Sequence, residues 1–282
     1  MAGVLILDSG STKTKGFYYS GPKQLDFSGP GINPYYQNTK EIEQVLKTIF
    51  PEVMNELQWV YFYGAGCSDP QHQNTVKEAL SMHFPMAKIE VNHDLLGAAR
   101  AVCQDQAGVV GILGTGSNAC VFDGHEIIKE YFSIGFLLGD EGSGAVLGRQ
   151  LAKDYFEERM PKPLRLKLEA FMGKKDRNFL KAIYASEWPN RYLAQLTRWF
   201  NEEAQGSYRE EILQAHFQAF FQKFIFHLDP TNSATLYLIG SVAKGFESEI
   251  RDIASQNGIK IGQISGDPLP GLVQFHKKNI PG

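Results

Sequence analysis

Short apolar runs alternate with helically spaced segments through the first third of the chain. Runs of this length are typical of strands, and the spacing between them is typical of amphipathic helices. The expected strands lie at 4–8, 15–20, 59–63 and 88–92, and the expected helices lie near 38–50, 72–83 and 94–104. Because a strand-hairpin-strand unit is followed by strand-helix alternation, the pattern predicts a mixed sheet covered by helices.

The second half of the chain begins with the same strand-like pattern, at 109–122, and then becomes mostly helical from 142 to about 228. Four phenylalanines recur at helical spacing in this stretch, namely Phe217, Phe220, Phe221 and Phe224. Such a stripe is typical of core packing rather than of a cofactor site. A strand at 234–239, a helix from 242 to about 256 and a last helix near 268–278 resume the α/β pattern.

The composition is that of an ordinary globular protein. The 282 residues are 43% hydrophobic and 21% charged with a net charge of -3, which is long enough for two domains. No basic surplus indicates a nucleic-acid partner, and no apolar run has the length of a membrane span or of a leader. We therefore expect a cytoplasmic protein without a nucleic-acid or membrane partner. Cys67, Cys103 and Cys120 lack the spacing of a disulfide or metal framework, which predicts reduced thiols.

One pattern occurs twice: a buried strand leads into a loop of glycine, serine and threonine, and a second strand follows. The first loop lies at 8–15 and the second at 114–118. Each tip carries backbone N–H and hydroxyl donors, so two of them could clamp one polyphosphate, although either alone is typical of an ordinary turn. Neither loop has the P-loop spacing or opens a helix, which disfavours P-loop and dinucleotide-binding folds.

Asp94 stands where the strand at 88–92 gives way to a helix. It is either a helix N-cap or a general base at the carboxyl end of a strand, where α/β sheets bind their ligands. Sequence position alone leaves both roles open.

Two later clusters also lie where apolar runs meet helices. In 139–144, the carboxylates of Asp140 and Glu141 either stabilise a helix start or hydrogen-bond sugar hydroxyls at the mouth of a cleft. Gly240 and Ser241 leave an open surface against which a purine could lie. No low-complexity linker separates the two halves, so we expect a cleft between them as the ligand site.

Taken in order, these loops resemble the sugar kinase/actin/Hsp70 superfamily. Asp8-x-Gly-Ser-Thr-x-Thr-Lys is similar to its first phosphate loop, 114–118 to its second, and 239–242 to its adenosine motif. Gly-Thr-Gly-Ser-Asn followed by Gly-Asp-Glu-Gly-Ser is similar to N-acetylglucosamine kinase and the related BadF/BadG-type ATPases. The matching segments run from residue 8 to 242, so the resemblance covers nearly the whole chain.

The resemblance implies an α/β, actin-like ATPase fold of two ribonuclease H-like lobes, each a mixed sheet flanked by helices, with a cleft between the lobes. The N-terminal lobe would comprise 1–105, with the final helix of 268–282 packed back on it. The C-terminal lobe would comprise 106–267, with a helical insertion at 142–228.

The resemblance also implies roles for single residues, with ATP and Mg²⁺ as cofactors. Asp8 would hold Mg²⁺ through water, and Asp94 would be the catalytic base that takes the proton from the sugar hydroxyl. The ATP-binding residues would be Ser11, Thr12, Lys13, Thr115, Gly116, Gly240 and Ser241. The sugar-binding residues would be Asn33, Asp94, Ser117, Asn118, Gly135 and Asp140. Lys13 and Lys15 either add charge near the phosphates or are only solvated.

The function that the resemblance implies is an ATP-dependent kinase that phosphorylates a hydroxyl of an amino sugar, with N-acetylglucosamine giving its 6-phosphate. An alternative is a BadF/BadG-type ATPase with a regulatory or dehydratase-activating role, because Asp8-Ser9-Gly10-Ser11 is nearer to that branch. Dehydratase activators share an Fe–S cluster through a cysteine motif, and nothing comparable surrounds the cysteines here. A third hypothesis is a non-catalytic switch or sugar sensor. Whether the chain is a homodimer is left open.

Overall fold

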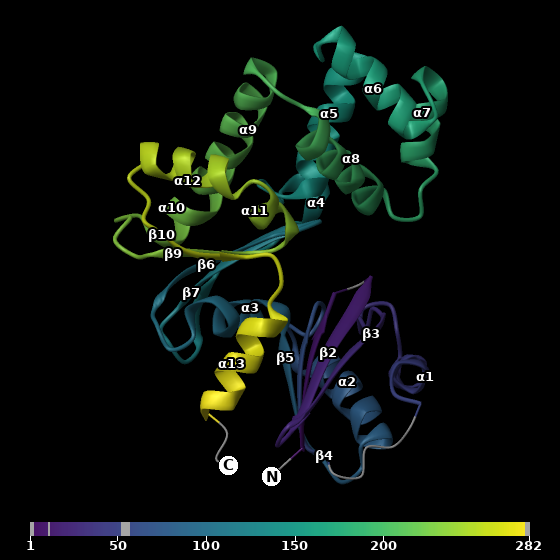
Figure 1. The fold of residues 1–282 in the computed structure, drawn as a ribbon, viewed down its shortest axis with the longest axis vertical. Helices are drawn as coiled ribbons and strands as arrows, with labels where there is room; N and C mark the ends of the chain where they lie inside the picture. The colour runs from purple at the N-terminus through teal and green to yellow at the C-terminus, as the bar shows by residue number, and fades with distance from the viewer. Residues whose placement is uncertain (1–2, 11, 52–56, 280–282) are drawn as a thin grey trace. The chain divides into compact units, whose positions relative to one another are not determined.

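The computed structural model describes residues 3–10, 12–51 and 57–279. The chain divides into two compact units, Met1–Asp105 with Asp267–Gly282, and Gln106–Gly266. Each unit is built on a five-stranded mixed sheet flanked by helices (Figure 1), which confirms the predicted two-lobe α/β class. Within the described ranges, no helix is long and apolar enough to cross a membrane.

The first sheet has the strand order β3-β2-β1-β4-β5. Its strands are β1 (Gly3–Ser9), β2 (Lys13–Ser20), β3 (Lys23–Pro30), β4 (Leu57–Gly64) and β5 (Lys88–His93). The hairpins β1–β2 and β2–β3 are antiparallel, whereas β1, β4 and β5 run parallel. The register aligns Ser9 with Gly64 and Gly64 with His93, so the carboxyl ends of the three parallel strands share one edge of the sheet.

Helices cover both faces of the first sheet. They are α1 (Thr39–Ile49), α2 (Pro70–His83), α3 (Asp94–Cys103) and α13 (Leu269–Asn279). The helices α1 and α2 pack on the face that carries Leu5, Leu7 and Phe62. The other face carries Tyr61 and Tyr63, and it is covered by α3 and by α13, which returns to this unit from the far end of the chain (Figure 1).

Local signals start the helices on the first face. Asn38 and Glu41 form a capping box at the start of α1, because the Asn38 side chain accepts from the Glu41 amide and the Glu41 side chain accepts from the Asn38 amide. Asp69 caps α2, and Pro70 stands in its first turn, where a missing N–H costs nothing.

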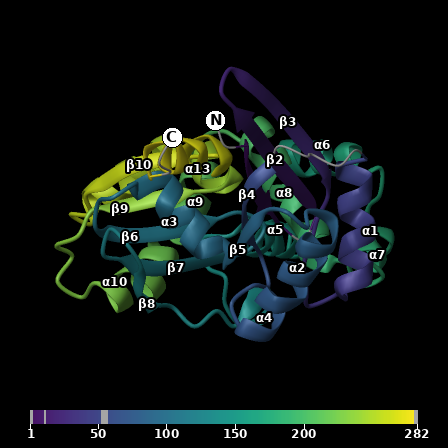
Figure 2. The same ribbon diagram turned by 90° about the horizontal axis from the view of Figure 1, so that it is seen from below.

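The second sheet has the order β10-β9-β6-β7-β8, which can be followed across Figure 2. Its strands are β6 (Gly108–Leu113), β7 (Ser117–Phe122), β8 (Ile127–Glu130), β9 (Leu236–Ile239) and β10 (Ile261–Ser265). As in the first unit, the central strand is antiparallel to its hairpin partner, β7, and parallel to the neighbour on its other side, β9. The repeated sequence pattern therefore forms two equivalent hairpins.

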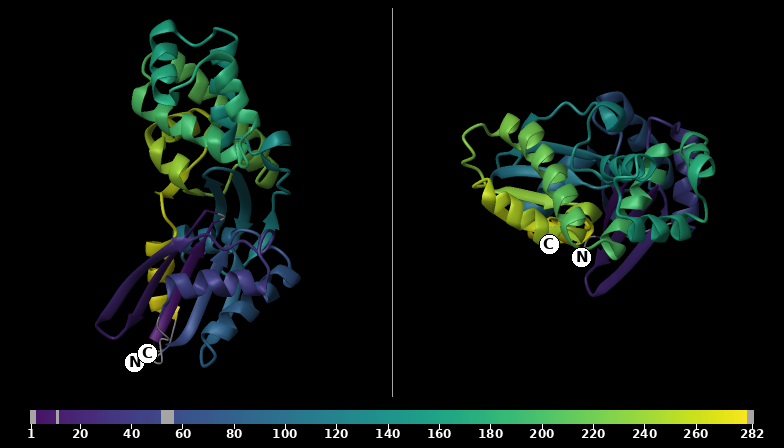
Figure 3. Two further views of the ribbon diagram at one scale, coloured as in Figure 1. Left: turned by 90° about the vertical axis from the view of Figure 1, so that its right-hand side faces the viewer. Right: turned by 90° about the horizontal axis from the view of Figure 1, so that it is seen from above.

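A helical segment follows the second hairpin, as the sequence predicts, and Figure 3 shows it in teal and green. Its helices are α4 (Gly135–Leu138), α5 (Gly144–Phe156), α6 (Lys162–Met172), α7 (Asp176–Tyr184), α8 (Pro189–Glu203), α9 (Ser207–Phe220), the π-helical turn η1 (Phe221–Ile225) and α10 (Phe226–Leu228). The four phenylalanines of the stripe are all buried in the core of this unit. Their expected packing role is confirmed.

Three outer strands and one helix boundary differ from the expectations. The outer strands β3, β8 and β10 were not expected, because their residues are mostly exposed or half-buried and show little apolar alternation. The single helix expected from 242 to 256 is wrong. Two helices, α11 (Ser241–Gly245) and α12 (Glu247–Gln256), are separated at Phe246, which leaves the helical conformation with φ -117° and ψ 29° while its side chain is buried.

Candidate active site

Asp8 lies at the carboxyl end of the central strand of the first sheet, directly opposite Lys15 in the register with β2. Burial is the main cause that raises the pKa of its carboxyl to about 7. The charges of Asp94 and Asp267 raise this pKa further, and the ammonium of Lys15 opposes the rise. Lys15 in turn forms an ion pair with Asp267. Three carboxylates, those of Asp8, Asp94 and Asp267, and the ammonium of Lys15 therefore interact near the end of β1.

The base of the first loop is held by hydrogen bonds of two buried hydroxyl groups, those of Ser9 and Thr14. Neither residue has a role predicted from the sequence. The Ser9 and Thr14 hydroxyl oxygens lie 2.7 Å apart across the hairpin, and Ser9 Oγ accepts from the Ile32 amide at 2.8 Å. Thr14 donates to the Pro30 carbonyl at 2.8 Å. These buried bonds tie the loop to the segment that carries Asn33.

The tip of the first loop is open to solvent. Thr12 and Lys13, two of the predicted phosphate contacts, are exposed. Ser11 lies outside the described residues. Because the base of the loop is held by hydrogen bonds and its tip is exposed, the side chains of Thr12 and Lys13 are accessible to a ligand.

Asp94 follows β5 as the first residue of α3, and the register places Asp8 level with Asn92, two residues before Asp94. The N-cap position belongs to His93, and no side chain caps this helix. The capping interpretation of Asp94 is therefore wrong. Its side chain is 44% exposed, and its Oδ1 stands 3.9 Å from Nδ1 of His93.

Asn33 is buried in a turn of the same unit. Its Oδ1 accepts from the Tyr35 amide at 3.0 Å, and its backbone N–H donates to Gln37 Oε1 at 2.8 Å. Gly66 lies against it with φ +82°, and a Cβ there would come within 2.8 Å of the Tyr35 ring. Asn33 thus shapes the turn by its own hydrogen bonds, whatever it contributes to a ligand.

In the second unit the loop at 114–116 is held against the start of α5. The amides of Gly144 and Ala145 donate to the carbonyls of Gly114 and Thr115, at 2.8 and 3.0 Å. Thr115 is exposed. Ser143 caps α5 by accepting from the Val146 amide, so the helix start needs neither neighbouring carboxylate as its cap.

Asp140 packs under the second loop. It has a left-handed φ of +60°, and a Cβ on Gly116 would stand 2.9 Å from its Oδ2. Burial is the main cause that raises the pKa of Asp140 to about 6, and its hydrogen bond with the Ser133 hydroxyl opposes the rise. Ser117, which donates to the Glu141 carbonyl at 2.8 Å, joins the same cluster.

Two more of the predicted sugar contacts, Asn118 and Gly135, lie in the same unit. The Asn118 side chain accepts from the Ala119 amide at 2.8 Å and donates to Glu130 at 3.2 Å. Gly135 is exposed with φ +70° at the start of α4.

Gly240 brings the predicted adenosine loop onto the phosphate loop of the same unit. It has φ +120°, and a Cβ there would overlap the carbonyl of Leu113, the residue that precedes the second loop. Only glycine permits this approach. Ser241, exposed, begins α11 beside it.

His216, on α9, supports the loop at 139–144 and was missed by the sequence analysis. It is buried, and burial lowers its pKa to about 4, while hydrogen bonding to the backbone of Gly142 and Ser143 works in the other direction. Lys223 forms an ion pair with Glu141 of the same loop. A histidine on an otherwise apolar helix face gives no sequence signal that would have revealed this contact.

The donor set fits a hydrated magnesium ion better than a metal enclosed by protein ligands. Among the described residues, no group of three or more histidine, cysteine, aspartate or glutamate side chains is arranged to hold a metal. Mg²⁺ typically keeps several waters and takes one or two carboxylates together with phosphate oxygens. Burial, and then the charges of Asp94 and Asp267, raise the pKa of the Asp8 carboxyl, so a bound cation would favour its ionised form, which suits it to that role.

Two sheets with matching hairpins, each presenting a polar loop, define a two-lobe protein of the actin-like ATPase type. No protein-family model matches the chain, and no curated protein matches it. Solved structures do match. A protein from Porphyromonas gingivalis described as a "Putative N-acetylglucosamine Kinase" is 35% identical with a TM-score of 0.92, over 98% of this chain and 99% of that one.

Two more distant structures share the fold. A second "Putative N-acetylglucosamine Kinase", from Chromobacterium violaceum, is 18% identical with a TM-score of 0.71, over 98% of this chain and 99% of that one. A ROK family transcriptional regulator, a homologue of the E. coli MLC protein, is 11% identical with a TM-score of 0.62, over 98% of this chain and 78% of that one. The identity and coverage of the Porphyromonas protein show that the chain belongs to the N-acetylglucosamine kinase family of sugar kinases.

Proposed function

We propose that the protein is an ATP-dependent kinase that transfers the γ-phosphate to a hydroxyl of an amino sugar, and that N-acetylglucosamine, giving its 6-phosphate, is the substrate. The observation that carries the proposal is the pair of carboxylates at the carboxyl edge of the first sheet. Asp8 is the second-last residue of β1, and Asp94 follows β5 without a capping role. Ligands of α/β sheets bind at this edge.

The two carboxylates differ in a way that suits a metal-assisted phosphoryl transfer. Burial, and then the charges of Asp94 and Asp267, raise the pKa of Asp8, so a bound cation would stabilise its ionised form. Asp94 is partly exposed, so a substrate hydroxyl can reach it. In this proposal Asp8 holds hydrated Mg²⁺, which neutralises charge on the phosphate oxygens when it is bound.

The reaction then needs little covalent chemistry from the protein. The sugar oxygen forms a bond to the γ-phosphorus as the bond between that phosphorus and the bridging oxygen of ADP breaks. Asp94 orients the sugar hydroxyl and accepts its proton as the new bond forms. Thr12, Lys13, Thr115 and Gly116 would contact the phosphates, and Gly240 with Ser241 would border the adenosine.

The second unit supplies the polar cluster that supports an amino-sugar substrate. Ser117 and Asp140 are buried beside the second loop, and the Asp140 carboxylate can accept hydrogen bonds from sugar hydroxyls. With Asn33, Asn118 and Gly135, they form the proposed sugar contacts. The 35% identity to a protein described as a "Putative N-acetylglucosamine Kinase" supports N-acetylglucosamine as the first sugar to test.

The test is an ADP-release assay with Mg-ATP and a panel of N-acetylglucosamine, N-acetylmannosamine, glucosamine and glucose. We expect N-acetylglucosamine to give the highest kcat/KM and NMR of the product to show phosphate on O6. Asp94→Asn should lower kcat by about 10²–10⁴ with little change in the KM for ATP. Asp26→Asn, which removes an exposed carboxylate from β3, is the matched control and should leave kcat unchanged.

Two outcomes would contradict the proposal. ADP release that no sugar stimulates would indicate the ATPase alternative. Full activity in Asp94→Asn would remove the base from the mechanism even if a sugar is phosphorylated.

A further inference from the structure

The helix α7 carries apolar side chains on two different faces. On its inner face, Phe179 is buried and Ile183 is partly buried, and both pack against the core of the second unit. On its outer face, Leu180 and Tyr184 are 41% and 82% exposed. Because these two residues are four positions apart, they are neighbours on the helix surface. The inner pair holds the helix to the unit, and the outer pair forms an exposed apolar surface at the periphery of that unit (Figure 1).

Four exposed cations accompany this apolar pair. They are Lys174 and Lys175, just before the helix, and Arg177 and Lys181, within it. Arg177 and Lys181 each precede one of the two apolar residues by three positions, which places all four on the outer face. No salt bridge within the described part of the chain involves any of the four cations. Asp176 is the only acidic residue between positions 174 and 184.

The charge of this segment is opposite to that of the whole chain. The chain has 28 basic and 31 acidic residues, whereas positions 162–181 have seven basic and two acidic ones. Neither the net charge of -3 nor the length of the apolar runs, from which no membrane partner was predicted, reveals a surplus that is confined to one segment. A local cluster of this kind creates a positive potential that attracts anions even when the net charge is negative.

Cations and apolar side chains on one helix face match the surface of an anionic membrane. Lysine and arginine are attracted to anionic headgroups, while leucine and aromatic side chains enter the boundary between headgroups and acyl chains. Tyrosine is enriched at this depth because its ring is apolar and its hydroxyl is polar. A nucleic acid would use the cations but would gain nothing from Leu180. A membrane uses both parts of the face.

We propose that the outer face of α7, together with Lys174 and Lys175, is a docking surface for membranes of anionic phospholipid. In the bound state the helix lies in the plane of the interface. Leu180 and Tyr184 reach the boundary with the acyl chains, and the four cations contact lipid phosphates. The proposal does not depend on the catalytic function of the protein.

The test measures co-sedimentation of the full chain with vesicles of phosphatidylcholine alone, and of phosphatidylcholine and phosphatidylglycerol in equal parts. We expect binding to the anionic vesicles only, weakened when the salt concentration is raised to about 0.5 M. Arg177→Gln/Lys181→Gln should lower the partition coefficient by about twentyfold or more, because each cation near an anionic surface contributes about fivefold. Leu180→Ser/Tyr184→Ser should lower it by about tenfold and leave its salt dependence in place.

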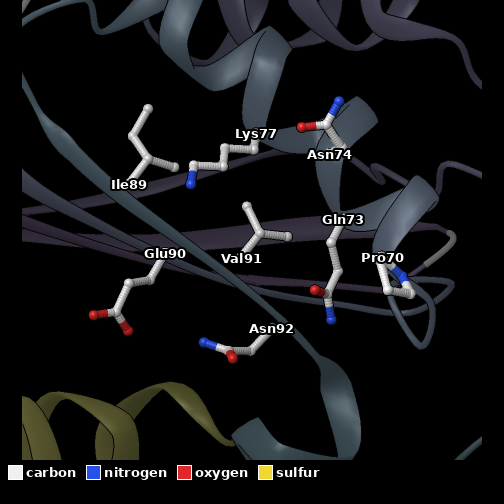
Figure 4. Close-up of a pocket in the computed structure, with 8 residues that line it drawn as sticks. All are labelled: Pro70, Gln73, Asn74, Lys77, Ile89, Glu90, Val91 and Asn92. Atoms are coloured by element: carbon white, nitrogen blue, oxygen red, sulfur yellow. The ribbon is translucent and has the colours of Figure 1, made fainter.

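Lys40→Gln/Lys77→Gln is the matched control, because it removes two exposed cations from the first unit and makes the same change in net charge. Lys40 lies on α1. Lys77 lines a groove of about 420 Å³ between α2 and β5, together with Ile89 and Glu90 (Figure 4). This variant should bind as the wild type does. Circular dichroism confirms that each variant is folded.

A fluorescent label distinguishes insertion from attraction by charge alone. The environment-sensitive dye NBD, attached to Tyr184→Cys, should shift its emission to shorter wavelength when anionic vesicles are added. The same dye on His125→Cys, at an exposed position of the same unit, should show no shift. Labelling is selective because the three native cysteines are buried.

A wild type that does not bind the anionic vesicles overturns the proposal, even if this face binds an acidic protein or a nucleic acid. Equal partition coefficients for Arg177→Gln/Lys181→Gln and Lys40→Gln/Lys77→Gln would show that the membrane contact lies elsewhere on the protein. An unshifted dye at position 184 would show that the face does not enter the interface, and this too would overturn the proposal.

Discussion

Acidification is expected to loosen the last helix from the first sheet, because His276 is buried there in its neutral form. The side chain is 3% exposed, and its ring stacks on Tyr61 with centroids 3.8 Å apart. Arg100 donates to the Tyr63 hydroxyl at 2.8 Å, and the Tyr63 hydroxyl lies 2.9 Å from Nε2 of His276. Because the arginine can only donate, the Tyr63 hydroxyl accepts its hydrogen bond and is free to donate its own to His276. Nε2 of His276 is therefore the unprotonated nitrogen that accepts this bond.

Protonation of Nε2 would break this chain of bonds and add a charge near Arg100. Burial, and then the charge of Arg100, lower the pKa of His276 from 6.5 to about 3. When α13 detaches, the imidazole meets water and its pKa returns to about 6.5. The detached state therefore binds more protons between these two values. The stabilisation is fully present above pH 6.5 and is lost as the pH falls toward 3.

The magnitude follows from the two pKa values. Between about pH 7.5 and about pH 5, the docked helix loses about 2 kcal/mol relative to the detached one, which is about a thirtyfold change in the opening equilibrium. Hydrogen exchange of the α13 amides, corrected for the intrinsic pH dependence of exchange, measures this change directly. We expect α13 to lose about thirtyfold in protection in the wild type.

His276→Gln provides the comparison, because glutamine keeps a polar group near Tyr63 but does not titrate in this range. The pH-dependent loss should disappear in this variant, and His125→Gln, at an exposed position of the second unit, should retain it. An equal loss of protection in the wild type and in His276→Gln would refute the reasoning, as would a wild type whose α13 protection does not change.

Two further predictions concern the second unit. Gly240→Ala should lower the free energy of unfolding by about 2 kcal/mol or more in urea titrations, because the new Cβ meets the Leu113 carbonyl at φ +120°. Gly10→Ala, with open space around the new Cβ, should change the free energy of unfolding little. Equal stability of the two variants would contradict this prediction. Asp140→Asn should raise the KM for the sugar by about tenfold or more, the loss of one charge-assisted hydrogen bond. Because the pKa of Asp140 is about 6, kcat/KM for the sugar should decrease below that pH, and it should decrease more in the wild type than in Asp140→Asn. Parallel pH profiles of the two proteins would exclude Asp140 as a sugar-binding carboxylate.

Much of the fold could be predicted from local patterns. The central strands of both sheets are nearly continuous apolar runs, and two helices of the first unit, α1 and α2, start at recognisable caps, Asn38 and Asp69. Outer strands such as β3 were missed, because an exposed strand needs no apolar alternation and is defined by the neighbour to which it bonds. The break at Phe246 was missed for a similar reason, since burial of its side chain is a tertiary contact.

The candidate site divides in the same way. The sequence identified Asp8, Asp94 and Asp140 as polar residues next to strands or helices, but it left open whether Asp94 only caps a helix. The backbone answered that question by giving the N-cap position to His93. The contacts of His216 with the backbone of 142–143 could not be predicted from the sequence, because the two segments are distant in sequence and share no motif.

The sequence by itself determined the two hairpins with their loops of glycine, serine and threonine, their order, and the small residues that allow close backbone approach, because these properties depend on neighbouring residues and backbone sterics alone. Tertiary structure decided which charges meet. Lys15 reaches Asp267 across 252 positions of the chain, and α13 returns to the first sheet to bring that aspartate near Asp8. Burial and charge at that site come from packing of remote segments, and local sequence carries no information about packing of that kind.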